Sequence, residues 1–349
     1  MTFSDWKPQL SELCAEIRVR TRRALADALA ANDRELARPQ GIGAGDYTYG
    51  LDLPSESYLR EWQEARAREG ALSVMTEDMG WRHLGPAPGG GFRELDTFDH
   101  GGPRIGFDPV DGTRNLMTNL RSAWTVVSFA PPGPAQPRLS DLTGGMVTEI
   151  PTTHARDFRI FFSDGETTWL EQGTLADDIA DELRSVGDAR VVRTDDDDRA
   201  DHGYFPFFRY DPLERLYIAK WEARFFQRLA ELEHAEMHSI YNDQYCSTGG
   251  QLAELMLGNY RMMVDARGLS ARRTGHAQTI AKPYDIGGAI VCARAAGCEM
   301  CDAEGNELDF PMDVTTPIDF CGYVNAKTRA RLEPHWLAAI EPPDEKPRD

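Results

Sequence analysis

The chain has 349 residues, of which 41% are hydrophobic, and it carries a formal net charge of −19 at pH 7. This length predicts two domains of ~100–200 residues each, and the acidic balance argues against a nucleic-acid polymer as partner because phosphate backbones are bound by clustered Lys and Arg. No run approaches the ~18 apolar residues that cross a bilayer, and residues 1–10 lack the apolar core of a secretory signal, so we expect a cytoplasmic protein without a membrane partner.

The N-terminal segment is predicted to be a long helix followed by a turn. Residues 4–32 have apolar side chains at steps of three to four residues, which is typical of an amphipathic helix. The glycine cluster at 41–46 has no preceding strand and no Gly-Lys-Ser/Thr ending, so we interpret it as a flexible turn and not as a phosphate-binding loop. Residues 47–53 then predict a short strand that ends at Asp52 and enters a helix at Ser55.

The stretch 105–115, Ile-Gly-Phe-Asp-Pro-Val-Asp-Gly-Thr-Arg-Asn, is the most informative part of the chain. Its Pro and Gly are poorly suited to the middle of a helix or strand, so we expect a buried strand over 105–107 that stops and presents Asp108 and Asp111 from a turn. Thr113 would then open a helix whose free N–H groups favour an anion. Carboxylates beside such a helix start are explained if metal cations lie between them and the anion; an Asp-rich surface turn is the alternative.

Further acidic residues occur at separate places. Residues 71–76 predict a strand that delivers Glu77 to its carboxyl end. Asp285 begins a later helix of small residues, where a simple N-cap role is the common alternative. The four aspartates at 195–198 are interpreted first as a solvated loop.

The remaining pattern is α+β. Apolar or alternating runs predict strands over 124–130, 143–149 and 158–162, and a second unit begins near Asp188 with a strand over 189–193, an aromatic-rich helix over 213–235 and a strand over 260–264. We therefore expect an N-terminal α+β domain over residues 1–186 that carries most metal ligands. A C-terminal α/β domain over residues 187–349 would complete the metal and substrate site.

The six cysteines are expected to be reduced in a chain of this kind. Cys298 and Cys301 form a Cys-x-x-Cys motif, but no second pair of Cys or His follows at finger-like spacing, so a zinc site is disfavoured.

Several of these segments resemble one family. The stretch 108–115 resembles the DPxDGTxN signature of the inositol monophosphatase family, within the lithium-sensitive, magnesium-dependent phosphatase superfamily that also includes fructose-1,6-bisphosphatases. Residues 284–289, with Ala-Ala-Gly at 295–297, are similar to the family's second signature, and Thr-Glu-Asp at 76–78 is similar to its Gly-Glu-Glu. The resemblance covers most of the chain in order and implies the family's layered α-β-α-β-α sandwich.

The resemblance also implies a role for each matching residue. Two or three Mg²⁺ ions would be held by Glu77, Asp108, Asp111, Asp285 and the carbonyl of Val110. Asp52 and Thr113, with Glu77, would orient and deprotonate an attacking water, so that no covalent intermediate forms. Asp111, Gly112 and Thr113 would contact the substrate, and we count Gly249, at the start of the helix after Cys-Ser-Thr, among the substrate residues. The implied substrate is a small phosphate monoester, lithium should inhibit, and a homodimer is possible.

Departures from the family pattern bear on the substrate. An acidic substrate ligand before the second signature is replaced by a basic stretch that contains Arg267, Arg272, Arg273, His276 and Lys282. We expect Arg272 and Arg273 to meet a second anionic group on the substrate, with an exposed loop as the alternative. By family order the aspartates at 195–198 fall near the substrate rim.

Three functions remain open from the sequence. The first is a phosphomonoesterase for a cyclitol or sugar phosphate. The second is a fructose-1,6-bisphosphatase or a 3′-phosphoadenosine 5′-phosphate phosphatase. The third is a catalytically idle relative that binds a ligand, which is disfavoured because every acidic position expected of the metal site is filled.

Overall fold

A nine-stranded sheet dominates the N-terminal half of the chain, with the strand order β11-β10-β9-β8-β7-β6-β3-β4-β5. The computed structural model describes residues 1–33, 35–42, 47–210, 212, 215–233, 237–275 and 280–341. Neighbouring strands are antiparallel except that β3 runs parallel to β6, with Thr76 opposite Phe107. The strands are β3 Leu72–Thr76, β4 Gly80–Pro86, β5 Phe92–Glu94, β6 Arg104–Asp111, β7 Ala123–Ala130, β8 Gly144–Ile150, β9 Asp157–Ser163, β10 Thr168–Thr174 and β11 Arg190–Val192.

Two long helices cover one face of this sheet. Helix α1 (Phe3–Ala31) buries the stripe that the sequence predicted, including Leu10, Leu13 and Ile17, and α2 (Leu53–Glu69) packs beside it. The short α4 (Ile179–Ser185) joins α1 through a buried ion pair between Arg18 and Glu182. The predicted helix over 4–32 is therefore confirmed.

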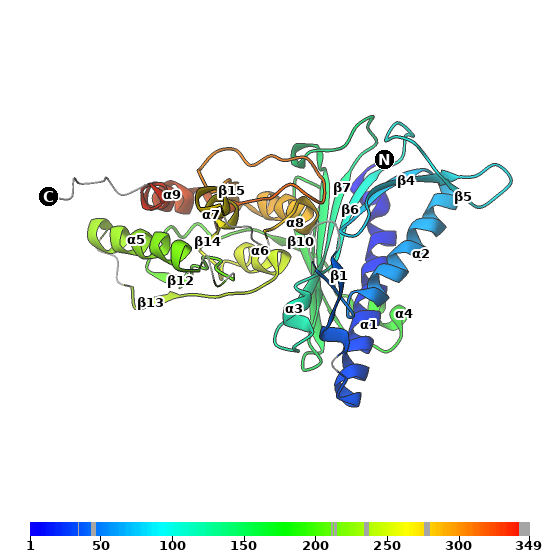
Figure 1. Cartoon of the computed structure of the whole chain (residues 1–349), viewed down its shortest axis with the longest axis horizontal. Helices are drawn as coiled ribbons and strands as arrows, with labels where there is room; N and C mark the ends of the chain where they lie inside the picture. The colour runs from blue at the N-terminus through cyan, green and yellow to red at the C-terminus, as the bar shows by residue number, and fades with distance from the viewer. Residues whose placement is uncertain are drawn as a thin grey trace.

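The opposite face is covered by α6 (Thr248–Met256) and α8 (Pro283–Ala296), which share a core with the sheet. Beyond them lies a small antiparallel sheet in the order β14-β16-β15 (Met262–Asp265, Phe320–Tyr323, Glu299–Cys301). Its outer side packs against α5 (Arg215–Glu233) and α9 (Ala326–Ile340). Figure 1 shows α1 and α2 on one side of the large sheet, α6 and α8 on the other, and α5 and α9 at the far end of the molecule. The predicted α-β-α-β-α layering is confirmed.

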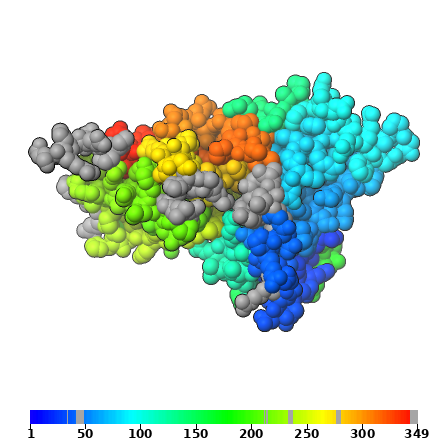
Figure 2. Space-filling model, viewed as in Figure 1, coloured from blue at the N-terminus to red at the C-terminus, as the bar shows by residue number. Residues whose placement is uncertain are grey.

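The smaller elements connect these layers. They are β1 (Pro39–Ile42) paired with β2 (Tyr47–Tyr49), β12 (His202–Tyr204) paired with β13 (Ser239–Tyr241), α3 (Thr113–Leu116), α7 (Arg267–Thr274) and the 3₁₀ turns Glu35–Ala37 and Leu139–Asp141. Figure 2 shows orange residues of the C-terminal half meeting cyan residues of the N-terminal half along one boundary. One hydrogen bond between the two halves runs from the Trp81 indole N–H to the carbonyl of Met312, at 2.7 Å. In the described part of the chain, no helix has the length and hydropathy needed to cross a bilayer.

Strand β6 departs from the sequence prediction. It does not stop at Phe107 but continues to Asp111. Asp108 pairs with Val126 of β7 and Asp111 pairs with Trp124, so β6 has one residue more than β7 between these two pairs. This bulge takes up one extra residue, so Pro109, which has no N–H, fits within the strand. The carboxylates therefore lie on the end of a strand and not in a turn after it.

Three other segments differ from the prediction. Gly41 lies in β1 and not in a turn, and residues 43–46 of that glycine cluster lie outside the described residues. Helix α3 is a single turn of four residues. The segment expected to open the second unit supplies β11, which pairs with β10 at the edge of the large sheet. The division at residue 186 itself stays a prediction.

Candidate active site

A cavity of about 410 Å³ lies where β3 and β6 end and where α3, α6 and α8 begin. Most of the acidic residues predicted from the sequence line it. The lining residues are Tyr49, Asp52, Glu77, Asp108, Val110, Asp111, Gly112, Thr113, Arg114, Tyr210, Cys246, Ser247, Thr248, Arg267, Ile280, Ala281, Lys282, Tyr284 and Asp285. Segments separated by more than two hundred positions thus meet at one place, as the motifs predicted.

Asp111 is held by the start of α6. One of its oxygens accepts from the Ser247 hydroxyl at 2.7 Å and from the Gly249 N–H at 2.6 Å, and the other accepts from the Thr248 N–H at 3.2 Å. A carboxylate at a helix N-terminus is stabilised by the unpaired N–H groups there. Gly249 therefore positions Asp111, and it is not among the described residues that line the cavity.

Asp108 has far fewer partners although it is only 7% exposed. Within the described residues its one hydrogen bond comes from the Val110 N–H, at 3.0 Å. Burial raises the pKa of Asp108 well above its ordinary value, and the negative charges of Asp111, Asp285 and Glu77 raise it further. A buried carboxylate among three other negative charges, with one hydrogen bond to compensate, fits a site for a cation.

Glu77 and Asp285 complete the acidic group from other elements. Glu77 follows β3 directly, and Asp285 lies in the first turn of α8, where one of its oxygens accepts from the Lys282 N–H at 2.8 Å. Among the described residues, no three Asp, Glu, His or Cys side chains converge as closely as a metal-ligand set. Mg²⁺ commonly keeps several waters between itself and its protein ligands, so carboxylates spread around one cavity still fit this ion.

Asp52 and Thr113 form a direct pair. The Thr113 hydroxyl lies 2.7 Å from Asp52 Oδ1 and 2.8 Å from the carbonyl of Val110. Burial raises the pKa of Asp52 to about 6, although the Tyr49 N–H and the Thr113 hydroxyl lower it. A carboxylate with this pKa can accept a proton near neutral pH.

The raised pKa values predict how stability depends on pH in metal-free protein. Burial raises the pKa of Asp52 and of Asp111 to about 6, from an ordinary 3.8. Between these values the folded state holds protons that the unfolded chain has released, so the free energy of unfolding contributed by these groups falls as pH rises from about 4 to about 6. Urea unfolding in the presence of a chelator across this range should show the decline, and it should be smaller in Asp52→Asn. An equal decline in both proteins would contradict the assignment to Asp52.

Two glycines allow the close approach of these elements. Gly112 has φ of +98°, and a Cβ there would lie 2.8 Å from the Cβ of Ser247. A Cβ on Gly249 would lie 2.8 Å from a methyl group of Val126 and 3.1 Å from Asp111 Oδ2. Both positions thus need glycine for α6 to reach β6.

Gly249→Ala is expected to destabilise the protein by roughly 1–3 kcal/mol, because the new methyl overpacks against β7 and displaces Asp111. Urea unfolding measures the change. Gly70→Ala is the matched control, since a Cβ there meets no atom within 4 Å and Gly70 has extended backbone. Equal stability of the two variants would show that α6 does not pack this tightly on β6.

Three basic side chains also line the cavity, but they are not the two arginines we predicted. Arg267, Arg114 and Lys282 are lining residues. Arg267 is held by Asp265, with Nε at 2.8 Å and Nη2 at 2.5 Å from its oxygens, and lies over the ring of Tyr210.

Arg272 and Arg273 lie in the last turn of α7, away from the described lining residues. Arg272 pairs with Asp319 at 2.6 Å, and Arg273 donates to the carbonyl of Ile340 while its guanidinium lies over Trp221. Helix α7 begins at Arg267, so residues five and six positions further on are carried more than a turn away from the cavity. His276, from the same basic stretch, lies outside the described residues.

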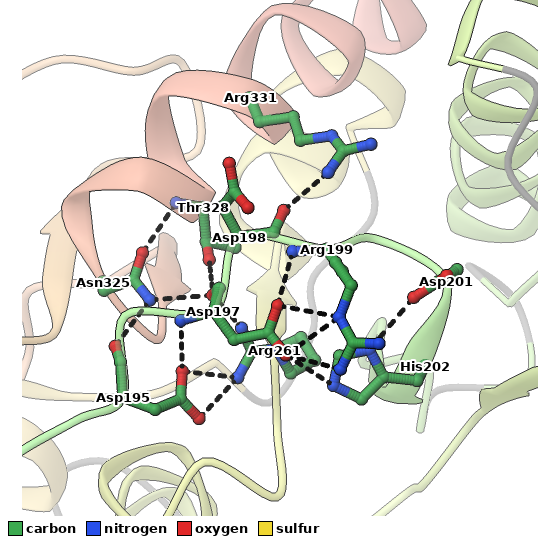
Figure 3. A network of polar contacts seen from close by, with 10 residues as sticks. All are labelled: Asp195, Asp197, Asp198, Arg199, Asp201, His202, Arg261, Asn325, Thr328 and Arg331. Carbon is green, nitrogen blue, oxygen red and sulfur yellow. Dashed lines mark hydrogen bonds and ion pairs between the residues drawn. The ribbon is translucent and has the colours of Figure 1, made fainter.

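The aspartates at 195–198, which we expected near the rim, are also not among the described residues that line the cavity. Figure 3 shows them laid against α9 and Arg261. The buried Arg261 donates to both carboxylate oxygens of Asp195 at 3.0 Å and to the carbonyl of Asp197. Asn325 donates to the carbonyls of Asp195 and Asp197 at 2.8 and 3.0 Å. Asp195, Asp196 and Asp198 are exposed and Asp197 is half-buried, so the interpretation of the run as a solvated loop agrees with the structure.

Arg261→Ala is expected to lower the free energy of unfolding by roughly 2–4 kcal/mol, since it removes the hydrogen bonds of a guanidinium that is only 1% exposed and leaves its space unfilled. Chemical unfolding measures this change. Arg199→Ala is the control, because Arg199 also pairs with Asp197 but lies at the surface, and its loss should leave stability unchanged within error. A comparable loss in both variants would contradict a special role for the buried guanidinium.

Several lining residues were not predicted from the sequence. Ser247 and Thr248 had a usable signal, because a Ser before Thr-Gly-Gly and an apolar helix is a typical N-cap. Tyr49, at the end of the three-residue strand β2, and Tyr210, in a loop, had none, since a single Tyr carries no spacing information.

No protein-family model matches this sequence, and no curated protein matches it. Solved structures, in contrast, share its fold along nearly the whole chain. Leishmania major fructose-1,6-bisphosphatase in holo form has a TM-score of 0.61 at 12% identity, with 97% of this chain and 98% of that chain covered. A Pyrococcus horikoshii protein described as having similarities to inositol-1 monophosphatase has a TM-score of 0.54 at 15% identity, covering 92% and 98%. The extragenic suppressor protein SuhB from Bartonella henselae has a TM-score of 0.53 at 14% identity, covering 93% and 98%.

The chain therefore has the fold of the inositol monophosphatase and fructose-1,6-bisphosphatase structures, as its motifs predicted. At these identities the likeness establishes the fold, and activity has to be argued from the site.

Proposed function

We propose that this chain is a Mg²⁺-dependent phosphomonoesterase that hydrolyses a cyclitol or sugar phosphate. The observation that carries the proposal is the presence of two buried aspartates, Asp108 and Asp111, in one cavity with Glu77 and Asp285. The fold shared with phosphatases of known structure supports it.

The cation ligands in this proposal are the carboxylates of Glu77, Asp108, Asp111 and Asp285 and the carbonyl of Val110. Mg²⁺ bound among these oxygens would supply charge neutralisation of the phosphate and a lower pKa for water. The mutual repulsion at Asp108 is then relieved, since each carboxylate faces positive charge instead of another anion.

The remaining residues position the reactants and move a proton. With Asp52 ionised, the Thr113 hydroxyl donates to Asp52 Oδ1, so a lone pair of Thr113 Oγ1 is left to accept from water in the cavity. As the water attacks phosphorus, its proton passes to Thr113 Oγ1 and the hydroxyl proton passes to Asp52. The ester P–O bond breaks in the same step, and the leaving alkoxide takes a proton from solvent water, to which Asp52 later releases the proton that it received. The N–H groups of Gly112 and Thr113, at the start of α3, would donate to phosphate oxygens. No Ser, Cys or His nucleophile is required.

A second candidate is favoured by the basic residues that line the cavity. Arg114, Arg267 and Lys282 supply positive charge there, which suits a substrate with a second anionic group, such as fructose 1,6-bisphosphate or 3′-phosphoadenosine 5′-phosphate. Lithium inhibition is an expectation shared by both candidates.

A substrate panel with a Mg²⁺ titration tests the proposal. We expect metal-dependent release of phosphate from inositol 1-phosphate or a hexose phosphate. Higher kcat/KM for either bisphosphorylated compound would favour the second candidate. The absence of metal-dependent release from every compound would favour an idle, ligand-binding relative and overturn both.

A further inference from the structure

A second cavity, of about 570 Å³, lies beside the first. None of its lining residues has a role in the proposed phosphatase reaction. The loop that leads into α6 contributes to both cavities, since Asp243 and Tyr245 line the second and Cys246 and Ser247 line the first. Its volume is within the ~300–1,000 Å³ of small-molecule sites. The second cavity therefore has the size of a ligand site.

Three tyrosines line this cavity, and Tyr204 offers the accessible apolar surface, since Tyr245 and Tyr260 are only 6% and 2% exposed. Tyr204, Tyr245 and Tyr260 line it, and the rings of Tyr204 and Tyr260 lie 6.1 Å apart. Tyr245 is fixed, because its hydroxyl accepts from the Trp124 indole N–H and donates to the carbonyl of Ser122, each at 2.7 Å. The Tyr204 side chain is 41% exposed and so is accessible from solvent.

The charged groups in the lining are paired with one another. Arg121 Nη1 donates to both oxygens of Asp243, at 2.8 and 2.7 Å, and the Tyr260 hydroxyl donates to Asp243 at 2.5 Å. Arg159 donates to Glu149 at 2.9 Å and to Glu254 at 3.1 Å.

This pairing decides which ligands the cavity suits. Two arginines face three carboxylates, so the lining carries no excess of positive charge for an anion, and a cation would have to displace an arginine. The same pairs present hydrogen-bond donors and acceptors side by side at the surface. An uncharged ligand with many hydroxyls can use both kinds of group in place of water without breaking an ion pair.

We propose that the second cavity binds an uncharged polyhydroxylated ring, such as a monosaccharide or a cyclitol. The apolar face of the ring packs on the exposed ring of Tyr204, and its hydroxyls bond to the carboxylate of Asp243 and the guanidinium of Arg121. This binding does not require the proposed phosphatase activity.

Calorimetric titration of metal-free protein with myo-inositol and with glucose tests the proposal. Saturable binding of at least one polyol is expected, weakened about tenfold or more in Tyr204→Ala, because stacking on one ring is worth about a factor of ten. Tyr241→Ala is the matched control, since Tyr241 is an exposed neighbour of Tyr204 but is not among the described residues lining the cavity. Asp108→Asn distinguishes binding in the second cavity from binding in the first. Tyr241→Ala and Asp108→Asn should each leave the affinity for the polyol unchanged.

Three outcomes would overturn the proposal. The first is no saturable binding of either polyol up to ~50 mM, a concentration that detects even millimolar affinity. The second is binding that survives Tyr204→Ala but is lost in Asp108→Asn, which would place the polyol in the first cavity. The third is binding of inorganic phosphate that depends on Tyr204, which would show that the cavity selects anions. Unfolding curves of each variant show that it is folded.

Discussion

Asp108→Asn is expected to reduce metal-dependent phosphate release by ~10³-fold or more in kcat/KM, because the proposed cation site loses a buried charged ligand. The same change is expected to stabilise the metal-free protein by roughly 1–3 kcal/mol, since it removes a buried carboxylate with one hydrogen bond among three other anions. Phosphate release against Mg²⁺ concentration and urea unfolding in chelator at pH 7.5 measure the two effects.

The opposite signs of these two effects make the prediction specific. If Asp108 had a purely structural role, its replacement would lower the stability and the activity of the protein together. Asp177→Asn is the control, because Asp177 is exposed, and it should change neither quantity. If Asp108→Asn destabilised the metal-free protein, the interpretation of the buried cluster as a cation site would be wrong.

Removal of the Asp52–Thr113 pair is expected to have the second largest effect. Asp52→Asn and Thr113→Ala should each lower kcat by ~10²–10⁴-fold, the usual contribution of a positioned proton acceptor, with little change in KM. Because Asp52 accepts a proton only when it is ionised, kcat/KM of the wild type at saturating Mg²⁺ should fall tenfold per pH unit below the pKa of Asp52, which burial raises and bound cations would lower. Asp52→Asn should lose this acid limb.

Thr113→Ser is the conservative control for this pair. It keeps the hydroxyl that lies 2.7 Å from Asp52, so its kcat should stay within about tenfold of wild type. Equal loss in Thr113→Ser and Thr113→Ala would mean that the methyl group, and not the hydroxyl, is what the site needs.

The sequence was sufficient for the layered fold and for the acidic side of the cavity. Asp108, Asp111, Glu77 and Asp285 each adjoin an apolar strand or a helix start, and such junctions are visible in a single sequence because periodicity and small residues mark them. The long helix α1 was predictable for the same reason.

The sequence did not show which of the basic residues line the cavity. Arg267 and Arg272 look alike in the sequence, and only the start of α7 at Arg267 decides which of them reaches the cavity. The course of β6 was also missed, because a bulge that admits Pro109 depends on the register with β7 and leaves no separate pattern in β6 itself. The aspartates at 195–198 were misplaced because their partners, Arg261 and Asn325, are more than sixty positions away.

The oxygens proposed to hold magnesium come from β6, from the end of β3 and from the first turn of α8. Neither half of the polypeptide possesses the full set, so high affinity would exist only after both have assembled correctly. Cation uptake would then report on the completeness of folding, and purified material that fails to take up the ion could be recognised as misassembled before any substrate is known.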